Sequence, residues 1–114
     1  MHELAIMSGI FSTCFDEAEK AHAKIITRIS VVIGERAGVE TEALKFSFEA
    51  LSKETIAENA VFDIEHIPCQ GQCNNCQYSF NVEDIFFLQC ERCGSDAKLK
   101  SGQELYVASI EIEI

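Results

Sequence analysis

Apolar and polar positions recur along the chain with periods that predict its helices and strands. At the start, apolar side chains return at every third or fourth position, which is the spacing of a helix with one buried face. We therefore predict a helix over residues 3–21. Its apolar stripe consists of Leu4, Met7, Phe11, Cys14, Phe15, Ala18 and His22.

The segment KIITRISVVIGE, residues 24–35, is rich in β-branched side chains and predicts the first strand. Simple alternation places Arg28 and Ser30 on one face of this strand. The opposite face, which we expect to be buried, carries Ile25, Thr27, Ile29, Val31 and Ile33.

A second amphipathic helix is predicted over residues 41–53. Leu44, Phe48 and Leu51 form its apolar stripe. Thr41 is expected to cap the N-terminus of this helix, because a threonine oxygen accepts hydrogen bonds from the first free N–H groups.

Two more strands complete the pattern. In AVFDIEHI, residues 60–67, Phe62 and Ile64 alternate with acidic side chains, and the strand ends at Pro68, which lacks the N–H that a strand ladder needs. The last eleven residues, ELYVASIEIEI, also alternate. Their expected apolar face consists of Tyr106, Ala108, Ile110, Ile112 and Ile114.

The order helix, strand, helix, strand, cysteine-rich insert, strand predicts an α+β fold. We expect two helices packed on a small three-stranded sheet, with an inserted zinc-ribbon-like module that projects from one end of it. The expected division is an α/β domain over residues 1–68 plus 101–114 and a metal-binding module over residues 69–100.

Composition narrows the possible functions. The 114 residues are 47% hydrophobic and 25% charged, as in ordinary soluble domains, and we expect no membrane span. The first residues lack the basic segment of a secretory signal, so a cytoplasmic protein with reduced cysteines is expected. Nineteen acidic residues against nine basic ones would repel nucleic acid, which is therefore not an expected partner.

The strongest chemical motif is a pair of C-x-x-C sequences, CNNC and CERC. Cys73 and Cys76 form the first pair, and Cys90 and Cys93 form the second. Such spacing lets each turn present two thiolates to one tetrahedral zinc ion. Because all four ligands come from the protein, the predicted zinc is structural and has no open position for catalysis. An iron–sulfur cluster and a redox dithiol remain alternatives that use the same thiolates.

Other cysteines and histidines are less informative. Cys69 lies close enough in sequence to compete with Cys73 as a zinc ligand. Cys14 is expected to be a small buried apolar residue. His22 and His66 are expected to be structural or surface imidazoles, although His66 lies near enough to the insert to influence the zinc ligands.

The amino end, MHE, offers a second metal site. The amine of Met1, the amide nitrogen of His2 and an imidazole nitrogen of His2 can close two fused chelate rings in one plane. The amide or carboxylate of Glu3 is an adjacent further donor. Planar nitrogen ligation suits Ni(II) and Cu(II) and does not suit zinc. Taken alone, a histidine at the second position is weak evidence for a metal site, and an exposed terminal imidazole is the favoured interpretation.

MHELAIMSGI, IGERAGVETEALKFSFEAL, the paired C-x-x-C motifs and GQELYVASIEIEI together resemble the HypA/HybF family of hydrogenase-maturation nickel metallochaperones. The resemblance covers essentially the whole chain in order. It implies Ni(II) as transferred cargo bound by His2 with contributions from Met1 and Glu3, and structural Zn(II) on Cys73, Cys76, Cys90 and Cys93. Gln77 departs from the glycine expected after a zinc knuckle, and Cys69 is an additional thiol.

The same resemblance implies partners: a nucleotide-hydrolysing chaperone for nickel insertion and the hydrogenase large subunit, with urease as a second target for some members. We find no catalytic constellation or nucleotide-binding loop, so an enzyme is not expected. The alternative is a zinc-ribbon adaptor that recruits a protein partner without carrying nickel. A redox protein based on Cys73 and Cys76 is a further alternative.

Overall fold

The computed structural model describes residues 3–114, and its elements follow the predicted order. The expected cysteine insert contributes three short strands of its own. The elements are α1 (Glu3–Lys20), β1 (Ile25–Gly34), α2 (Thr41–Ser52), β2 (Val61–Ile67), β3 (Gln70–Cys73), β4 (Ser79–Asn81), β5 (Ala97–Ser101) and β6 (Leu105–Glu113).

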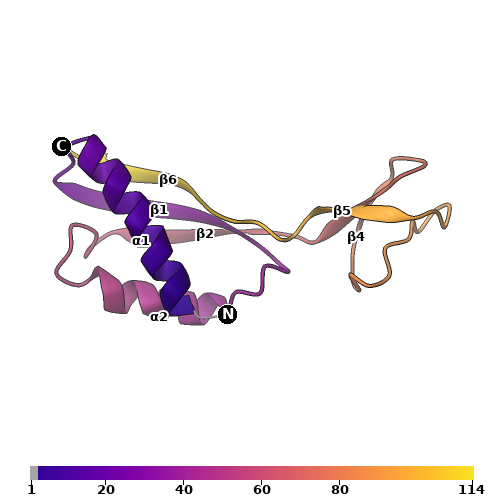
Figure 1. Ribbon diagram of the computed structural model, residues 1–114, viewed down its shortest axis with the longest axis horizontal. Coiled ribbons are helices and arrows are strands. Elements are labelled where there is room, and N and C mark those ends of the chain that lie inside the picture. Colours follow the sequence, from indigo (N-terminus) through magenta and orange to yellow (C-terminus); the bar gives the residue numbers. More distant parts are fainter. Residues whose placement is uncertain (1–2) are drawn as a thin grey trace.

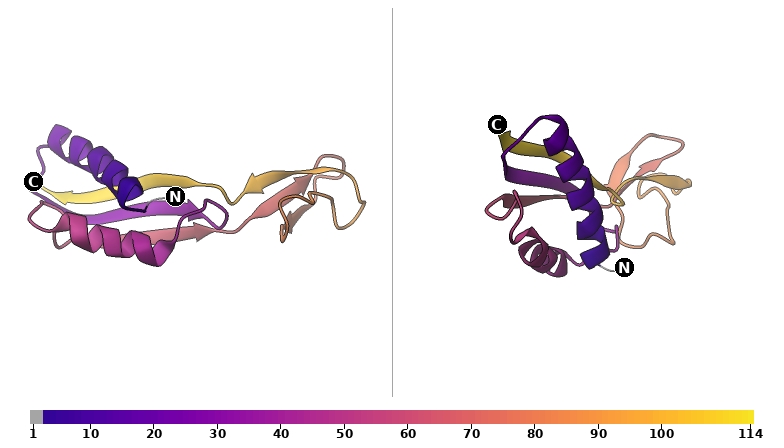
Figure 2. Two further views of the ribbon diagram at one scale, coloured as in Figure 1. Left: turned by 60° about the horizontal axis from the view of Figure 1, so that its bottom comes forward. Right: turned by 60° about the vertical axis from the view of Figure 1, so that its left-hand side comes forward.

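The first sheet has three strands, as expected, and their order is β2-β1-β6. Strand β1 pairs parallel with β2, to which it is joined through α2, and antiparallel with β6. Both helices cover the same face of this sheet (Figure 1, Figure 2). The opposite face carries Arg28, which forms ion pairs with Asp63 on β2 and Glu111 on β6.

The hydrophobic core lies between the helices and the sheet. Phe48 of α2 stacks on Phe62 of β2 with ring centroids 4.9 Å apart, and its ring also packs 5.6 Å from that of Phe11 on α1. The predicted stripe of α2 and the inward positions of β2 are thus confirmed. The buried core residues are Met7, Ile10, Phe11, Cys14, Ala18, Ile26, Ile29, Val31, Ile33, Leu44, Phe48 and Ala57.

The alternation predicted for β1 is wrong at its start. Ile26 is fully buried, whereas Ile25 is 46% exposed. The register with β6 skips one β1 residue between Ile26 and Arg28, so Thr27 is the extra residue of a bulge. Because a bulge reverses the alternation, the inward positions are as predicted only from Ile29 onward.

A second irregularity corrects the face predicted for β6. Ala108 is the extra residue in its pairing with β1, so Val107 packs against the core and Tyr106 is 54% exposed. Beyond the bulge, Ile110 and Ile112 pack against the core as expected. The remaining position of the predicted face, Ile114, is 80% exposed.

Three predictions at helix ends are also wrong. Leu4, the first residue of the predicted stripe of α1, is 54% exposed. His22 does not continue the stripe of α1: it is exposed and left-handed (φ 57°) just beyond the helix, where the Ala23 N–H donates to the Ala18 carbonyl. This is the hydrogen-bond pattern of a Schellman helix terminus. Thr41 is the first helical residue of α2, and Glu40 occupies the capping position without a side-chain cap.

The insert forms a separate sheet with strand order β4-β3-β5 and extends the molecule to 55 × 25 × 17 Å. Figure 1 shows it projecting from one end of the first sheet. It has its own small apolar cluster, built around Cys69, Phe80 and Val82. The α+β fold, with two helices on a small sheet and a cysteine-bearing insert, is therefore confirmed.

The residues that follow β1 form hydrogen bonds with both chain segments that connect the two sheets. The N–H of Glu35 donates to the Ile67 carbonyl, and the N–H of Arg36 donates to the Gly102 carbonyl at 2.6 Å. The Arg36 guanidinium also donates to the Glu83 carbonyl in the insert. These hydrogen bonds hold the insert to the helix-covered sheet, in addition to the two chain segments that join them covalently.

Within residues 3–114, neither helix has the combined length and hydropathy that a bilayer crossing requires.

Candidate metal centre

The fold brings the four predicted cysteines together. Their sulfur atoms all lie within 4.8 Å of one another. The Cys73 and Cys93 sulfurs are 3.5 Å apart, those of Cys76 and Cys90 are 3.6 Å apart, and those of Cys76 and Cys93 are 3.8 Å apart. Zinc–sulfur bonds of about 2.3 Å in a tetrahedron require sulfurs about 3.8 Å apart. The four-cysteine cluster therefore fits a zinc site.

Each C-x-x-C sequence forms a tight turn around its first sulfur. Cys73 Sγ accepts the N–H groups of Asn75 and Cys76, both at 3.3 Å, and Cys90 Sγ accepts the N–H of Arg92 at 3.4 Å. N–H donors favour the thiolate form over the thiol. The two turns thus favour the thiolate form of one sulfur in each C-x-x-C pair, and a thiolate is the form that binds a cation.

Both turns end in a left-handed residue. Gly94 follows the second pair with φ 72°, as expected from its lack of a side chain, and Gln77 follows the first pair with φ 67°. The departure from glycine noted in the sequence has therefore not changed the turn. Gln77 adopts the conformation that glycine adopts more easily.

The thiols of the cluster differ in acidity. Hydrogen bonds from the side chain and N–H of Ser95 lower the pKa of Cys93 to about 6. The N–H of Cys76, followed by that of Asn75, lowers the pKa of Cys73. The N–H of Tyr78 also acts to lower the pKa of Cys76. The neighbouring cysteine sulfurs and desolvation outweigh this effect and raise the pKa of Cys76 to about 11. A divalent cation would offset the repulsion among four adjacent thiolates.

The other two cysteines lie outside this group. Cys69 is buried in the apolar cluster of the insert with Phe80 and Val82, which argues against its competition with Cys73 for a metal. Cys14 is fully buried in the main core, and its burial raises the pKa of the thiol to about 11. All six cysteines are free.

Of the three predicted nickel ligands, Met1 and His2 lie outside the described residues. Glu3 is described: its carboxylate accepts the N–H of Glu40 at 3.1 Å. This places the beginning of α1 beside the beginning of α2. His66 is exposed on β2 and does not belong to the four-cysteine group.

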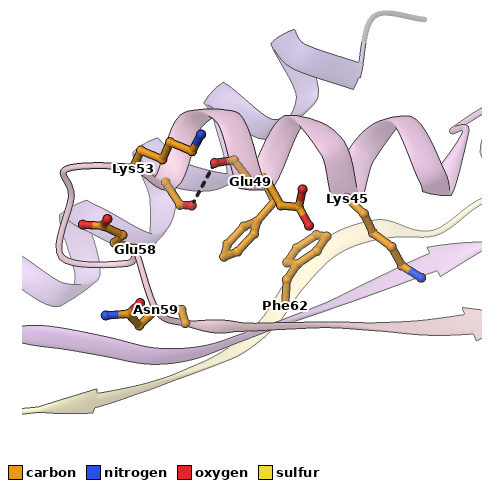
Figure 3. A pocket seen from close by; sticks show the side chains of 9 residues that line it. Lys45, Glu49, Lys53, Glu58, Asn59 and Phe62 are labelled. Carbon is orange, nitrogen blue, oxygen red and sulfur yellow. Dashed lines mark hydrogen bonds between the residues drawn. The ribbon is translucent and has the colours of Figure 1, made fainter.

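A hollow of about 590 Å³ lies between α2 and the start of β2, away from the cysteines (Figure 3). The stacked rings of Phe48 and Phe62 line it, together with mixed charges that include Lys53 and Glu58. Its one hydroxyl, on Ser52, donates to the Glu49 carbonyl at 3.5 Å.

Sequence reasoning missed two partners of the candidate ligands. Ser95 follows the second cysteine pair closely, and its position in CGS was the signal for a hydrogen bond to Cys93. The partner of Glu3 carried no signal in the sequence, because Glu40 is distant along the chain and contributes only its backbone N–H.

Comparison with known proteins extends these observations to the whole chain. Residues 1–112 match the family model described as hydrogenase/urease nickel incorporation, metallochaperone, hypA. The chain is similar to the hydrogenase maturation factor HypA of Caldanaerobacter subterraneus subsp. tengcongensis, with 38% identity over 99% of this chain and 100% of the relative. It is 40% identical to that of Chlorobaculum tepidum, again over 99% of this chain and 100% of the relative.

Solved structures give the same result. The solution structure of the Ni metallochaperone HypA from Helicobacter pylori superimposes with a TM-score of 0.69 and 27% identity, covering 99% of this chain and 98% of the other. A second solution structure, of HypA protein, has a TM-score of 0.73 and 28% identity, covering 98% and 96% of the two chains.

Proposed function

The chain belongs to the HypA family of nickel metallochaperones in hydrogenase maturation, and we propose that it binds Ni(II) at its amino terminus for insertion into [NiFe] hydrogenase. The observation that carries this proposal is the family match, which begins at residue 1 and so includes the MHE terminus. The family description names urease as well, and we extend the proposal to urease as a second recipient.

The proposed nickel ligands are the amine of Met1 and the nitrogens of His2. Two fused chelate rings of nitrogen donors provide the planar arrangement that Ni(II) accepts. A chelate at a chain end is open to solvent and can pass its metal to another protein, whereas a cage of four thiolates has no open position. The amino terminus therefore suits cargo, and the cysteine cluster suits a resident ion.

For Glu3 the geometry supports a contribution to nickel binding through the amide nitrogen. Its carboxylate already accepts the N–H of Glu40, at the beginning of α2. A negative side chain is stabilised there by the free N–H groups and the dipole of the helix. We therefore assign the Glu3 carboxylate to the anchoring of α1.

We propose Zn(II) as the resident ion of Cys73, Cys76, Cys90 and Cys93. The sulfur spacing and the N–H···S hydrogen bonds support this assignment over Cys69. When bound, the ion supplies the cross-link that holds both C-x-x-C turns together. The small apolar cluster of the insert alone offers little burial, so we expect the insert to depend on its metal.

We propose that residues 1–68 plus 101–114 form the nickel-binding domain and that residues 69–100 form the zinc module. Separate apolar clusters in the two parts support this division. The family role further supports a nucleotide-hydrolysing partner chaperone and the hydrogenase large subunit as partners. Six free cysteines support a reducing compartment, the cytoplasm.

The decisive experiment is a nickel titration of the untagged protein, followed by visible absorption. The same titration is made with His2→Ala and with an acetylated amino terminus, and both are expected to lose the planar Ni(II) spectrum. His66→Ala provides a matched control, because it removes an exposed imidazole from β2. Equal binding by all four proteins would refute the amino-terminal site and favour an adaptor that carries no nickel.

A further inference from the structure

Two adjacent phenyl rings are exposed on the zinc module. They belong to the segment that connects β4 to β5, whose backbone Figure 2 shows. Phe86 is 88% exposed and Phe87 is 74% exposed. Phenylalanine is ordinarily buried, and neighbouring exposed aromatic rings are typical of surfaces that another molecule covers. These two side chains contribute nothing to the apolar cluster of the module.

The turn that carries the two rings is well defined. The Asp84 carboxylate accepts the N–H of Phe86 at 2.9 Å, and the Asp84 carbonyl accepts the N–H of Phe87 at 3.0 Å. The flanking residues Ile85 and Leu88 pack into the apolar cluster of the module. Because both flanking side chains point inward, the two phenyl rings between them are held outward.

The chain segment that carries the rings is acidic, although Arg36 and Arg92 lie near its ends. Residues 82–91 contain three acidic residues and no lysine or arginine. Glu83 and Glu91 line the same hollow beside β4. Such charges repel an anionic membrane surface and are complementary to a protein pocket that is apolar within and basic at its rim.

In the proposed function, the two metal sites lie in different parts of the molecule and have different roles. The cargo sits at the amino end, and the cysteine cage holds an ion that is not transferred. The module nevertheless projects along the 55 Å axis of the molecule, where it can contact another protein. Recognition of the nickel recipient is a task that such a projecting element can perform without disturbing the cargo.

We propose that Phe86 and Phe87 dock the zinc module into an apolar, base-rimmed pocket on the hydrogenase large subunit. This inference rests on the proposed function, because it takes the recipient from there. Aromatic side chains that enter a partner pocket commonly carry much of an interface's binding energy, and their loss weakens binding by about tenfold or more.

The test is the affinity of the zinc-loaded, full-length protein for the nickel-free precursor of the large subunit, measured by biolayer interferometry. Phe86→Ser combined with Phe87→Ser is expected to weaken binding by about tenfold or more. Phe46→Ser is the matched control, since it removes a ring that is 72% exposed on α2. The control is expected to bind as the unaltered protein does, and all variants should retain zinc and nickel.

A second variant tests the charges separately. Glu91→Lys leaves both rings in place and is expected to weaken binding several-fold at low salt, with the difference disappearing at high salt. It also keeps the proposal testable if the serine variant loses zinc.

Three outcomes would overturn the docking proposal. The first is equal affinity of the serine variant and the unaltered protein. The second is failure of the unaltered protein to bind the precursor while it binds nickel normally, which leaves the proposed nickel function intact. The third is binding to phosphatidylcholine vesicles that disappears in the serine variant without any change in precursor binding, since this would assign the rings to a membrane surface.

Discussion

The carboxylate of Glu3 accepts a hydrogen bond from the backbone N–H of Glu40 at 3.1 Å. This bond joins the first residue of α1 to the residue that precedes α2, although 36 residues separate them in sequence. The third residue of the chain is therefore held against the body of the protein, immediately after the proposed nickel ligands.

Glu3→Gln tests whether this carboxylate anchors the helix or binds nickel. If it anchors the helix, the substitution leaves the Ni(II) absorption spectrum unchanged and lowers the free energy of unfolding by about 0.3–1 kcal/mol. Glu42→Gln, in the first turn of α2, is a control for the loss of one negative charge near the same helix end. A shifted Ni(II) spectrum in Glu3→Gln alone would make the carboxylate a ligand.

Nickel affinity is expected to fall as the pH is lowered. The amine and the imidazole of the proposed chelate have ordinary pKa values of about 7.7–8.0 and 6.5, and protons compete with the metal for both nitrogens. Between pH 7.5 and 6.3 we expect the dissociation constant to rise by about tenfold or more. Competition with a chelator of known affinity measures this change. A dissociation constant independent of pH would exclude these two nitrogens as ligands.

The residues after the two cysteine pairs are both left-handed, but one is glutamine and the other is glycine. We therefore predict that exchanging these residue types has opposite effects at the two turns. Gln77→Gly relieves an unfavourable φ of 67° and is expected to stabilise the module by about 1 kcal/mol. Gly94→Gln introduces the same cost at the other turn and should destabilise it by about 1–2 kcal/mol. Zinc release to a chelator should become slower in the first variant and faster in the second. The same direction of change in both would contradict this account.

Gly34→Ala is expected to disturb the junction between the sheets. A methyl group at Gly34 would overlap the backbone carbonyl of Gly102, whose oxygen accepts the N–H of Arg36. Relief of this overlap must move one of the connecting segments, at a cost of about 1–3 kcal/mol in the free energy of unfolding.

Gly9→Ala is the matched control for this change. Among the described residues, and apart from its chain neighbours and the nearby backbone of α1, no atom lies within 4 Å of a methyl group placed at Gly9. Alanine favours a helix over glycine by about 0.5–1 kcal/mol, so this variant should be more stable. Denaturant titration of both variants measures the difference, and equal stability would show that the junction tolerates displacement.

Because the Cys14 thiol is buried, we predict that the protein loses stability in alkaline solution. Burial raises the pKa of its thiol to about 11, whereas the unfolded chain ionises this thiol near its ordinary value of 9.0. Its contribution is therefore fully present below about pH 9 and is lost as the pH rises through 11. Between pH 8 and 10.5, Cys14→Ala should lose about 1–2 kcal/mol less stability than the unaltered protein. Parallel declines in the two proteins would contradict the prediction.

Local patterns were sufficient for much of the fold. The stripe at Met7, Phe11, Cys14 and Ala18 depends only on the helical repeat, and those residues are buried as predicted. The four cysteines also came together as their spacing indicated, because each C-x-x-C turn is built from consecutive residues. The order of the helices and strands follows from the same local preferences.

The places where prediction failed depend on contacts between distant segments. Ile26 replaces Ile25 in the core because β1 pairs with β6 and has an extra residue, Thr27, in that pairing. The β6 residues opposite this bulge lie more than 80 residues later in the chain. No periodicity within β1 carries that information. The outward position of Phe86 likewise depends on the inward packing of Ile85 and Leu88 against strands of the module.

The sequence by itself therefore determined the two helices, the three strands of the helix-covered sheet, their order and the thiolate quartet, since these follow from the backbone geometry of neighbouring residues. The three short strands of the insert were not predicted. Only the tertiary structure decided which side of each bulge is buried, that Cys69 lies outside the quartet, and that Glu3 meets Glu40. These features require two remote segments to be brought together, and hydrogen bonding and packing between them set the outcome.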